Sequence, residues 1–118
     1  MQEKTVFKIA TVEEWSKSTM NGTFEGSPDD RRDGFIHLSA KHQLQGTLEK
    51  HFKGKGDLVL IAFEVAKLGP ALKWEQSRGG ELFPHLYASI TVSDALWQRQ
   101  LSSDETGVAE INEEWFAC

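Results

Sequence analysis

The sequence has little of several residue types that define special protein classes: 118 residues include one cysteine, two methionines and three prolines. Cys118 cannot form an internal disulfide, so we expect a reducing, cytoplasmic environment and no catalytic thiol at the chain end. The longest apolar run covers residues 58–63, far short of the ~20 residues that a membrane-spanning helix needs. The first residues show no signal-peptide pattern. At 39% hydrophobic residues, the chain has too many large apolar side chains for the collagen-like, low-complexity or disordered classes.

Basic charge is also scarce, since 13 Lys and Arg face 18 Asp and Glu for a net charge of −5. Non-specific nucleic-acid binding depends on a basic surface, so we do not expect that role. The short apolar runs likewise lead us to expect no membrane partner. The charges are unevenly distributed: residues 41–55 hold four lysines and one glutamate, whereas residues 104–114 hold five acids and no base. Two interpretations stay open, a local basic patch for a phosphate-bearing small molecule and two differently charged solvated faces.

The length fits one domain, and no linker or repeat divides the chain. Residues 6–10 read as a short strand, and Thr11 with Glu14 three residues later forms a capping box that predicts a helix start. Residues 21–34 are rich in turn-formers and charges, which predicts a surface loop.

A second strand and helix follow this loop. Residues 35–39 read as a strand, and Ser39 is a candidate cap for a helix over residues 40–52. An apolar stripe at helical spacing predicts the face that packs on the core. The stripe consists of Ala40, Leu44, Leu48 and Phe52. Gln43 lies at its edge, His51 is expected to be partly buried, and His42 is expected to be solvated.

The second half of the chain is richer in strands. Residues 58–66 form the strongest strand, and their near-continuous apolar run predicts a central strand covered on both faces. Residues 72–76, 81–88 and 89–92 also read as strands, with Gly79-Gly80 as a tight connection. Ser93 is a candidate cap for a helical turn through Trp97. The whole pattern predicts a single compact α+β domain with a mainly antiparallel or mixed sheet and a few short helices.

Two segments combine residues that suit chemistry. In residues 33–39, strand alternation places Phe35, His37 and Ser39 on one face, which suits a cleft that holds a polar ligand. The alternative is a buried histidine paired with a neighbouring carbonyl.

The second segment, residues 74–87, carries charged and aromatic side chains around Gly79-Gly80, as functional loops often do. Glu81 and His85 could act as acid and base, and Arg78 could hold a phosphate or carboxylate. The alternative is that the aromatic residues belong to the core. These aromatic residues are Trp74, Phe83 and Tyr87.

Other sites are excluded or not expected. The four histidines have no HExxH motif and no cysteine partner, so we expect no zinc site. The sequence has no P-loop, GxGxxG or GxSxG motif. Its aspartates do not follow EF-hand spacing.

The strings DGFIHLS, LVLIAFEVAKL and LKWEQSRGGELFPHLYASI resemble the bacterial family called domain of unknown function 952, over roughly residues 5–92. The order of an I-H-L-S strand, a helix and an apolar strand is also similar to the middle of RNA 2′-phosphotransferases. Those enzymes belong to the ADP-ribosyltransferase-like superfamily, which binds NAD in a cleft between two small sheets. The resemblance therefore implies an ADP-ribosyltransferase-like fold with a split sheet.

The resemblance also implies roles for individual residues. His37 matches the strand histidine that contacts the NAD ribose, and Ser39 lies beside it. The superfamily often uses a late glutamate to stabilise the ribosyl cation, for which Glu81 is the first candidate and Glu75 the second. The sequence departs from the phosphotransferases in lacking an Arg-His pair before residue 37 and in having no room for their N-terminal winged-helix domain.

These observations lead to a hypothesis and an alternative from another class. The hypothesis is a cytoplasmic, monomeric domain that binds NAD or a related nucleotide as substrate and transfers or hydrolyses its ADP-ribosyl group. In it, Tyr87 or Trp74 stacks on the nicotinamide, with Arg78, His85 and Gln43 as further binding candidates. The alternative is a non-catalytic module for a small metabolite or peptide. Convergence of Glu81 and His37 on one cavity would favour the enzyme. A third interpretation makes Trp115 and Phe116 an exposed dimer contact.

Overall fold

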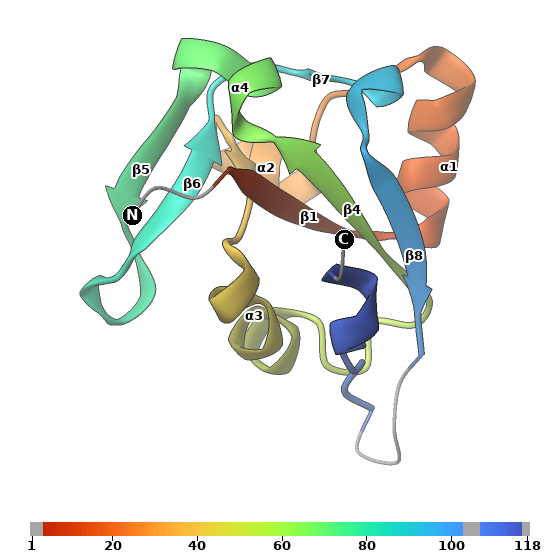
Figure 1. The fold of residues 1–118 in the computed structure, drawn as a ribbon. Helices are drawn as coiled ribbons and strands as arrows, with labels where there is room; N and C mark the ends of the chain where they lie inside the picture. Colours follow the sequence, from red (N-terminus) through yellow and green to blue (C-terminus); the bar gives the residue numbers. More distant parts are fainter. Residues whose placement is uncertain (1–3, 103–106, 117–118) are drawn as a thin grey trace.

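The computed structural model describes residues 4–102 and 107–116, which form short helices and three small sheets (Figure 1). The strands are β1 (Thr5–Thr11), β2 (Thr23–Phe24), β3 (Ile36–His37), β4 (Leu58–Glu64), β5 (Leu72–Gln76), β6 (Leu82–Leu86), β7 (Ile90–Thr91) and β8 (Trp97–Leu101). The α-helices are α1 (Val12–Asn21), α2 (Pro28–Asp33), α3 (Leu44–His51) and α4 (Val65–Leu68). Short 3-10 turns are η1 (Lys41–Gln43), η2 (Gly69–Ala71), η3 (Arg78–Gly80), η4 (Val92–Asp94) and η5 (Glu113–Phe116).

Two three-stranded sheets form the frame, one in the order β1-β4-β8 and the other in the order β3-β6-β5, and β2 pairs with β7. Every strand pair within the described ranges is antiparallel. Phe7 of β1 and Ser39 exchange two backbone hydrogen bonds and so join the two larger sheets. The prediction of a single compact α+β domain with antiparallel sheets and few helices is confirmed.

Strand β4 lies at the centre of the first sheet and is buried along six of its seven residues, as its apolar run predicts. Its side chains alternate between two hydrophobic clusters, one on each face of the sheet. Val59, Ile61 and Phe63 pack in one cluster with Trp15 of α1, Ile36, Leu38 and Leu86. Leu58, Leu60 and Ala62 pack in the other with Leu44 and Leu48 of α3. Leu44 and Leu48 thus confirm the middle of the predicted stripe, and Phe52 packs against the same cluster. The α-helix is shorter than the predicted 40–52, because residues 41–43 form the 3-10 turn η1.

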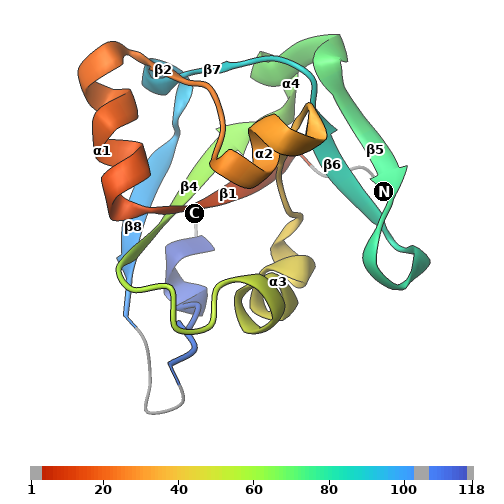
Figure 2. The same cartoon turned by 180° about the vertical axis from the view of Figure 1, so that it is seen from behind.

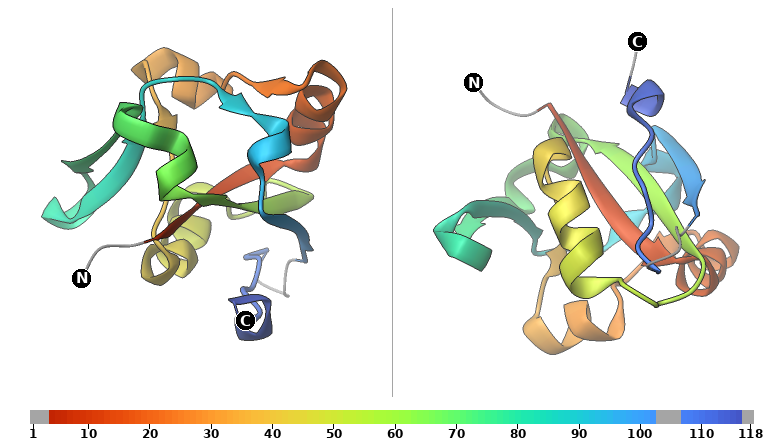
Figure 3. Two further views of the ribbon diagram at one scale, coloured as in Figure 1. Left: turned by 45° about the horizontal axis from the view of Figure 1, so that its top comes forward. Right: turned by 90° about the horizontal axis from the view of Figure 1, so that it is seen from below.

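Helix α3 and the C-terminal turn η5 cover the same face of the β1-β4-β8 sheet (Figure 3). The ring of Phe116 packs 5.3 Å from that of Phe7 and 5.7 Å from that of Trp97, centroid to centroid. Trp115 packs against the same cluster. Trp115 and Phe116 are therefore half-buried against this chain's own core rather than fully exposed, and a dimer contact through them stays a prediction.

The prediction of a surface loop over residues 21–34 is wrong, because the segment contains β2 and α2. Helix α2 begins with a capping box in which Ser27 and Asp30 satisfy each other's backbone N–H, and proline follows the cap. It ends at Gly34, whose φ of 86° is the left-handed conformation that glycine adopts without a Cβ penalty. Figure 2 shows α2 in front of the sheet, near β1.

Three smaller predictions also fail. Residues 93–97 do not form a helical turn: η4 ends at Asp94 and Trp97 begins the edge strand β8. Trp74 and Tyr87 are not core residues, since they are 36% and 44% exposed, whereas Phe83 is buried. His51 is exposed rather than partly buried.

The described part of the chain contains no helix long and apolar enough to cross a membrane.

Candidate functional site

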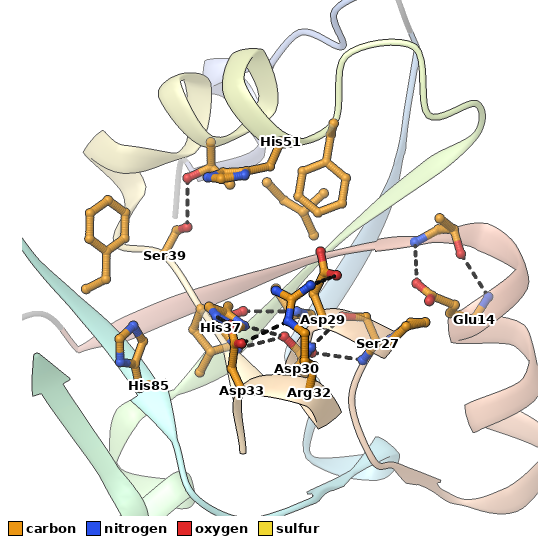
Figure 4. Close-up of a pocket in the computed structure, with 18 of the residues that line it drawn as sticks. Glu14, Ser27, Asp29, Asp30, Arg32, Asp33, His37, Ser39, His51 and His85 are labelled. Carbon is orange, nitrogen blue, oxygen red and sulfur yellow. Dashed lines mark hydrogen bonds and ion pairs between the residues drawn. The ribbon is translucent and has the colours of Figure 1, made fainter. Parts of the chain in front are cut away.

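A cavity of about 390 Å³ lies where α2 meets the strands of both larger sheets (Figure 4). Small-molecule pockets typically span ~300–1,000 Å³, so this volume suits a ligand of metabolite size. Three residues singled out in the sequence line it: His37, Ser39 and His85. Of the predicted face of segment 35–39, His37 and Ser39 line the cavity but Phe35 does not. Leu38, from the opposite face, packs in the core and also lines the cavity.

An ion pair between Lys8 and Asp30 forms the floor of the cavity. Lys8 follows Val6 and precedes Ala10 on the same face of β1, so strand alternation directs its side chain toward α2 rather than to solvent. Its Nζ lies 2.8 Å from Asp30 Oδ2, and the two side chains are 4% and 1% exposed. Lys8 Nζ also donates a hydrogen bond to the carbonyl of His37 at 3.0 Å. The pair thus fixes β1, α2 and β3 to one another.

The Asp30 carboxylate accepts four hydrogen bonds, which fills its acceptor capacity. Oδ2 accepts from Lys8 Nζ and, at 2.9 Å, from the backbone N–H of Ser27. Oδ1 contacts His37 Nδ1 at 2.6 Å and accepts from the His37 backbone N–H at 3.1 Å. Burial alone would raise the pKa of Asp30, but the His37 hydrogen bond and the Lys8 ammonium outweigh it and hold this pKa well below its usual range.

This depressed pKa predicts an acid-labile fold. Unfolded Asp30 takes up a proton below its unfolded pKa of ~3.9 while folded Asp30 does not, so stability is complete above that pH and falls as the pH drops toward the folded pKa. The loss approaches about 1.4 kcal/mol per pH unit from this one group. Urea unfolding between pH 2 and 5 should show a shallower acid slope for Asp30→Asn than for the wild type. Equal slopes would contradict the assignment.

His37 is held between two carboxylates. Its Nδ1 faces Asp30, and its Nε2 lies 3.0 Å from Asp33 Oδ2, one turn along α2. Each ring nitrogen therefore faces a carboxylate oxygen of α2. The carboxylate of Asp33 remains ionised, since the hydrogen bond from Arg32 lowers its pKa. The His37 side chain is 38% exposed and lines the cavity, where it can meet a ligand.

Glu75, His85 and Tyr87 form a second hydrogen-bonded group. Glu75 Oε1 accepts from Tyr87 Oη at 2.7 Å and contacts His85 Nδ1 at 2.8 Å. The hydrogen bond from Tyr87, followed by that from His85, lowers the pKa of Glu75. The Phe35 ring stacks on His85 at a centroid distance of 4.1 Å and lies 4.6 Å from that of His37. The two histidines therefore share one aromatic neighbour and belong to one site.

Ser39 and Gln43 have different surroundings. Ser39 Oγ lies 3.3 Å from Thr47 Oγ1 across the cavity wall. Gln43 is buried and acts in place of Ser39 as the cap of this turn: its Oε1 accepts from the backbone of Ala40, and its Nε2 donates to the carbonyl of Leu82. Ser39 can thus contact a ligand, whereas the contacts of Gln43 are those of a structural residue.

The remaining predicted residues do not converge on the cavity. Glu81 pairs with His42 at 2.8 Å on the exposed surface, and neither residue is among those that line the cavity with His37. Trp74 lies on the exposed part of β5. Arg78 begins η3, but its side chain lies outside the described part of the structure. Within the described ranges, no group of three or more His, Cys, Asp or Glu side chains is arranged to hold a metal ion.

The uneven charge distribution has two structural outcomes. Lys41 forms a 3.0 Å ion pair with Glu113, so part of the basic segment contacts the acidic tail. Lys55 instead lines the cavity and has no side-chain ion pair with a described residue, and Arg32 lines it from α2. Some of the basic charge is therefore available to an anionic group of a ligand.

Sequence reasoning missed the two residues at the centre of the site, Lys8 and Asp30. Each carries a local signal. Lys8 is the one charged residue in an otherwise apolar strand segment, Val6–Ala10, and Ser27-Pro28-Asp29-Asp30 has the spacing of a capping box with proline after the cap. That spacing predicts the helix, but the pairing of its aspartate with Lys8, 22 residues away, depends on the tertiary fold.

Comparison with known proteins shows the resemblance to domain of unknown function 952. The model of the family described as "Protein of unknown function (DUF952)" matches residues 9–98. The crystal structure of protein CC0527 from Caulobacter crescentus is similar to this chain, with 47% identity and a TM-score of 0.87 over 90% of this chain and 93% of that one. The solution NMR structure of CC0527 gives 48% identity and a TM-score of 0.79 over 88% and 90% of the two chains. Comparison with curated proteins gives no match.

Proposed function

Because the chain belongs to the DUF952 family, whose description names no activity, we propose a function from its cavity: the protein binds NAD or a related nucleotide there. One observation carries the proposal. His37 lines the cavity with its ring held between Asp30 and Asp33, at the position where the resemblance implies a ribose-contacting histidine. Beside the ring, the Asp33 carboxylate also lines the cavity and is 34% exposed, so it can accept a hydrogen bond from a sugar hydroxyl.

The other lining residues also fit the parts of a nucleotide. Ser39 and Thr47 supply hydroxyls for a sugar, and Lys55 supplies positive charge for a phosphate, whereas Arg32 is paired with Asp29 and Asp33. Phe83 offers an apolar surface for a base. Tyr87 and Trp74 are not among the lining residues, which argues against their stacking on the ligand.

We also propose that the fold is ADP-ribosyltransferase-like. In support, two small antiparallel sheets are joined at the Phe7–Ser39 bridge, and residues from both line the cavity. An ADP-ribosyl transfer or NAD hydrolysis would need a carboxylate near the ribose. Of the two candidates, Glu75 contacts a cavity-lining residue, His85, whereas Glu81 pairs with His42. The proposal includes a cytoplasmic location and a monomeric state.

A second function is favoured by the separation of Glu81 from His37. By the criterion stated for the sequence, this separation favours a non-catalytic module that binds a small polar metabolite in the same cavity. The two functions differ in whether nicotinamide is released from bound NAD.

A thermal-shift measurement with NAD, ADP-ribose, nicotinamide and ATP tests the proposal. A ligand at one hundred times its Kd adds about 2.7 kcal/mol to the stability of the folded protein, which raises Tm by several degrees for a chain of this size. We expect NAD or ADP-ribose to raise Tm of the wild type and of His42→Ala, an exposed histidine control, but not of His37→Ala. The absence of a shift with all four ligands, or an undiminished shift in folded His37→Ala, would refute the proposal.

A further inference from the structure

The hydrogen bonds around His85 determine which ring nitrogen carries its proton. Glu75 is ionised at neutral pH, because the ordinary pKa of a glutamate lies well below 7 and the hydrogen bond from Tyr87 lowers it further. An ionised carboxylate can only accept hydrogen bonds, so His85 Nδ1, 2.8 Å from Glu75 Oε1, must be the donor. The neutral ring consequently has its proton on Nδ1 and its lone pair on Nε2.

This Nε2 is open to the cavity. His85 is 6% exposed and lines the cavity, and Figure 4 shows its ring at the cavity wall. Nε2 has no hydrogen-bond partner among the described residues, 4–102 and 107–116. Every fully buried side-chain nitrogen among those residues does have a partner, so Nε2 is not fully buried. Nε2 must therefore be accessible to a molecule in the cavity. Stacking on Phe35 and the bond to Glu75 fix the ring in this orientation.

The two cavity histidines thus differ in whether a ring nitrogen can accept a hydrogen bond from a ligand. Both nitrogens of His37 face carboxylates, so its ring has no free lone pair, while His85 presents one. Their ring centroids are 5.7 Å apart, because His37 and His85 are register partners of β3 and β6. One small ligand can contact the exposed part of the His37 ring and donate a hydrogen bond to His85 Nε2.

We propose that His85 is the general base of the cavity, that Glu75 is its positioning residue, and that the group activated is a hydroxyl or a water molecule. The inference rests on the proposed binding of NAD. In the step, the acceptor oxygen forms a bond to the anomeric carbon of the ribose, and its proton passes to His85 Nε2. The bond between that carbon and the nicotinamide nitrogen breaks, its electron pair goes to the cationic ring, and nicotinamide leaves neutral.

This geometry also restricts the class of acceptor. A carboxylate or thiolate acceptor is already deprotonated and gains nothing from a base, whereas an alcohol or water must lose a proton as it attacks. His85 Nε2 therefore points to an alcohol, such as a sugar hydroxyl, or to water. The charged and titratable groups next to His85 are Glu75, Tyr87, His37 and, opposite it in the β5–β6 register, Lys73.

The tautomer can be measured without any ligand. Long-range ¹H–¹⁵N correlation spectra of the labelled protein at pH 8, assigned by comparison with His42→Ala and His85→Asn, should show His85 protonated at Nδ1 and unprotonated at Nε2. In Glu75→Gln the neutral amide no longer requires a donor at Nδ1, so the Nε2-protonated form should become populated. Glu64→Gln, an exposed glutamate at the end of β4, should leave the spectrum unchanged. An Nε2-protonated His85 in the wild type would overturn the inference.

Nicotinamide release from NAD tests the chemical step. General-base catalysis contributes roughly 10²–10⁴-fold, so His85→Asn should reduce the rate of release by at least about 100-fold. Asparagine can retain the hydrogen bond to Glu75, and we expect the NAD-induced rise in Tm to persist. Glu75→Gln should lower kcat with little change in KM, and His42→Ala should match the wild type.

The possible outcomes separate this inference from the proposed function. Wild-type protein that binds NAD but releases no nicotinamide, with or without added alcohols, would overturn the role of His85 and leave the binding proposal standing. Unchanged release by His85→Asn would do the same. Failure of the wild type to bind NAD would overturn both, while the ligand-free tautomer would still show whether Nε2 accepts hydrogen bonds in the cavity.

Discussion

Replacing Lys8 with methionine is expected to lower the free energy of unfolding by about 3–5 kcal/mol, the range seen when one partner of a buried ion pair is removed. Methionine retains most of the apolar stem, so lost packing contributes little. The Asp30 carboxylate would remain at the cavity floor without its ammonium partner, and the carbonyl of His37 would lose a donor. A stability of 5–15 kcal/mol is typical of small domains, so this change could unfold a large fraction of the protein.

Urea unfolding of Lys8→Met and of Lys17→Met, an exposed lysine on α1, measures this effect. The control should remain within about 0.5 kcal/mol of the wild type. The double variant Lys8→Met with Asp30→Asn removes both charges, so its loss should be smaller than the sum of the single losses by about 0.5–3 kcal/mol. A loss below 1 kcal/mol for Lys8→Met, or strict additivity in the double variant, would show that the pair contributes little.

The elements that could be predicted from the sequence are those whose signal is local and periodic. The capping box of Thr11 and Glu14 marks the start of α1, and the apolar run of β4 marks the central strand. The stripe at helical spacing identifies the buried face of α3. In each case the local sequence pattern alone predicts which side chains are buried, and the tertiary structure determines only which surface covers them.

The predictions for other elements failed because their residues also carry local signals that are typical of a different structure. Three aspartates, two arginines and a proline made residues 27–33 resemble a solvated loop, although the capping box within them starts a helix. Edge strand β8 carries Gln98, Arg99 and Gln100 at exposed positions, so it has little apolar alternation. Pairing with β4 on one side defines this strand, and a single-sequence pattern does not contain that information.

The candidate site was predictable in part for the same reason. His37, Ser39 and His85 lie in strand segments whose alternation can be read from the sequence, and all three line the cavity. The resemblance implies Glu81 only through its order along the chain, and order does not determine which surface a loop residue faces. Glu81 pairs with His42 instead. Partners separated by tens of residues, such as Lys8 and Asp30, become neighbours only through packing.

The second large effect is expected at Gly26, which precedes the cap of α2. Its φ is +107°, a conformation that residues with a side chain rarely adopt, and a Cβ built there would lie 2.8 Å from the Cβ of Asp30. The backbone strain alone costs about 1–3 kcal/mol, and forced overpacking adds about 1–3 kcal/mol. Gly26→Ala should therefore destabilise the fold by about 2–6 kcal/mol, the sum of the two effects.

Gly22→Ala is the matched control, because Gly22 also has a positive φ, +85°, but an added Cβ would meet no atom within 4 Å. The destabilisation of Gly22→Ala should therefore equal the cost of the backbone strain alone. The clash in Gly26→Ala has a functional consequence as well, since moving Asp30 moves the acceptor that orients His37. We expect Gly26→Ala to lose the NAD-induced rise in Tm, while Gly22→Ala keeps it. Equal destabilisation of both variants with equal ligand response would show that Asp30 can shift without disturbing the cavity, and the position of α2 would then not control the site.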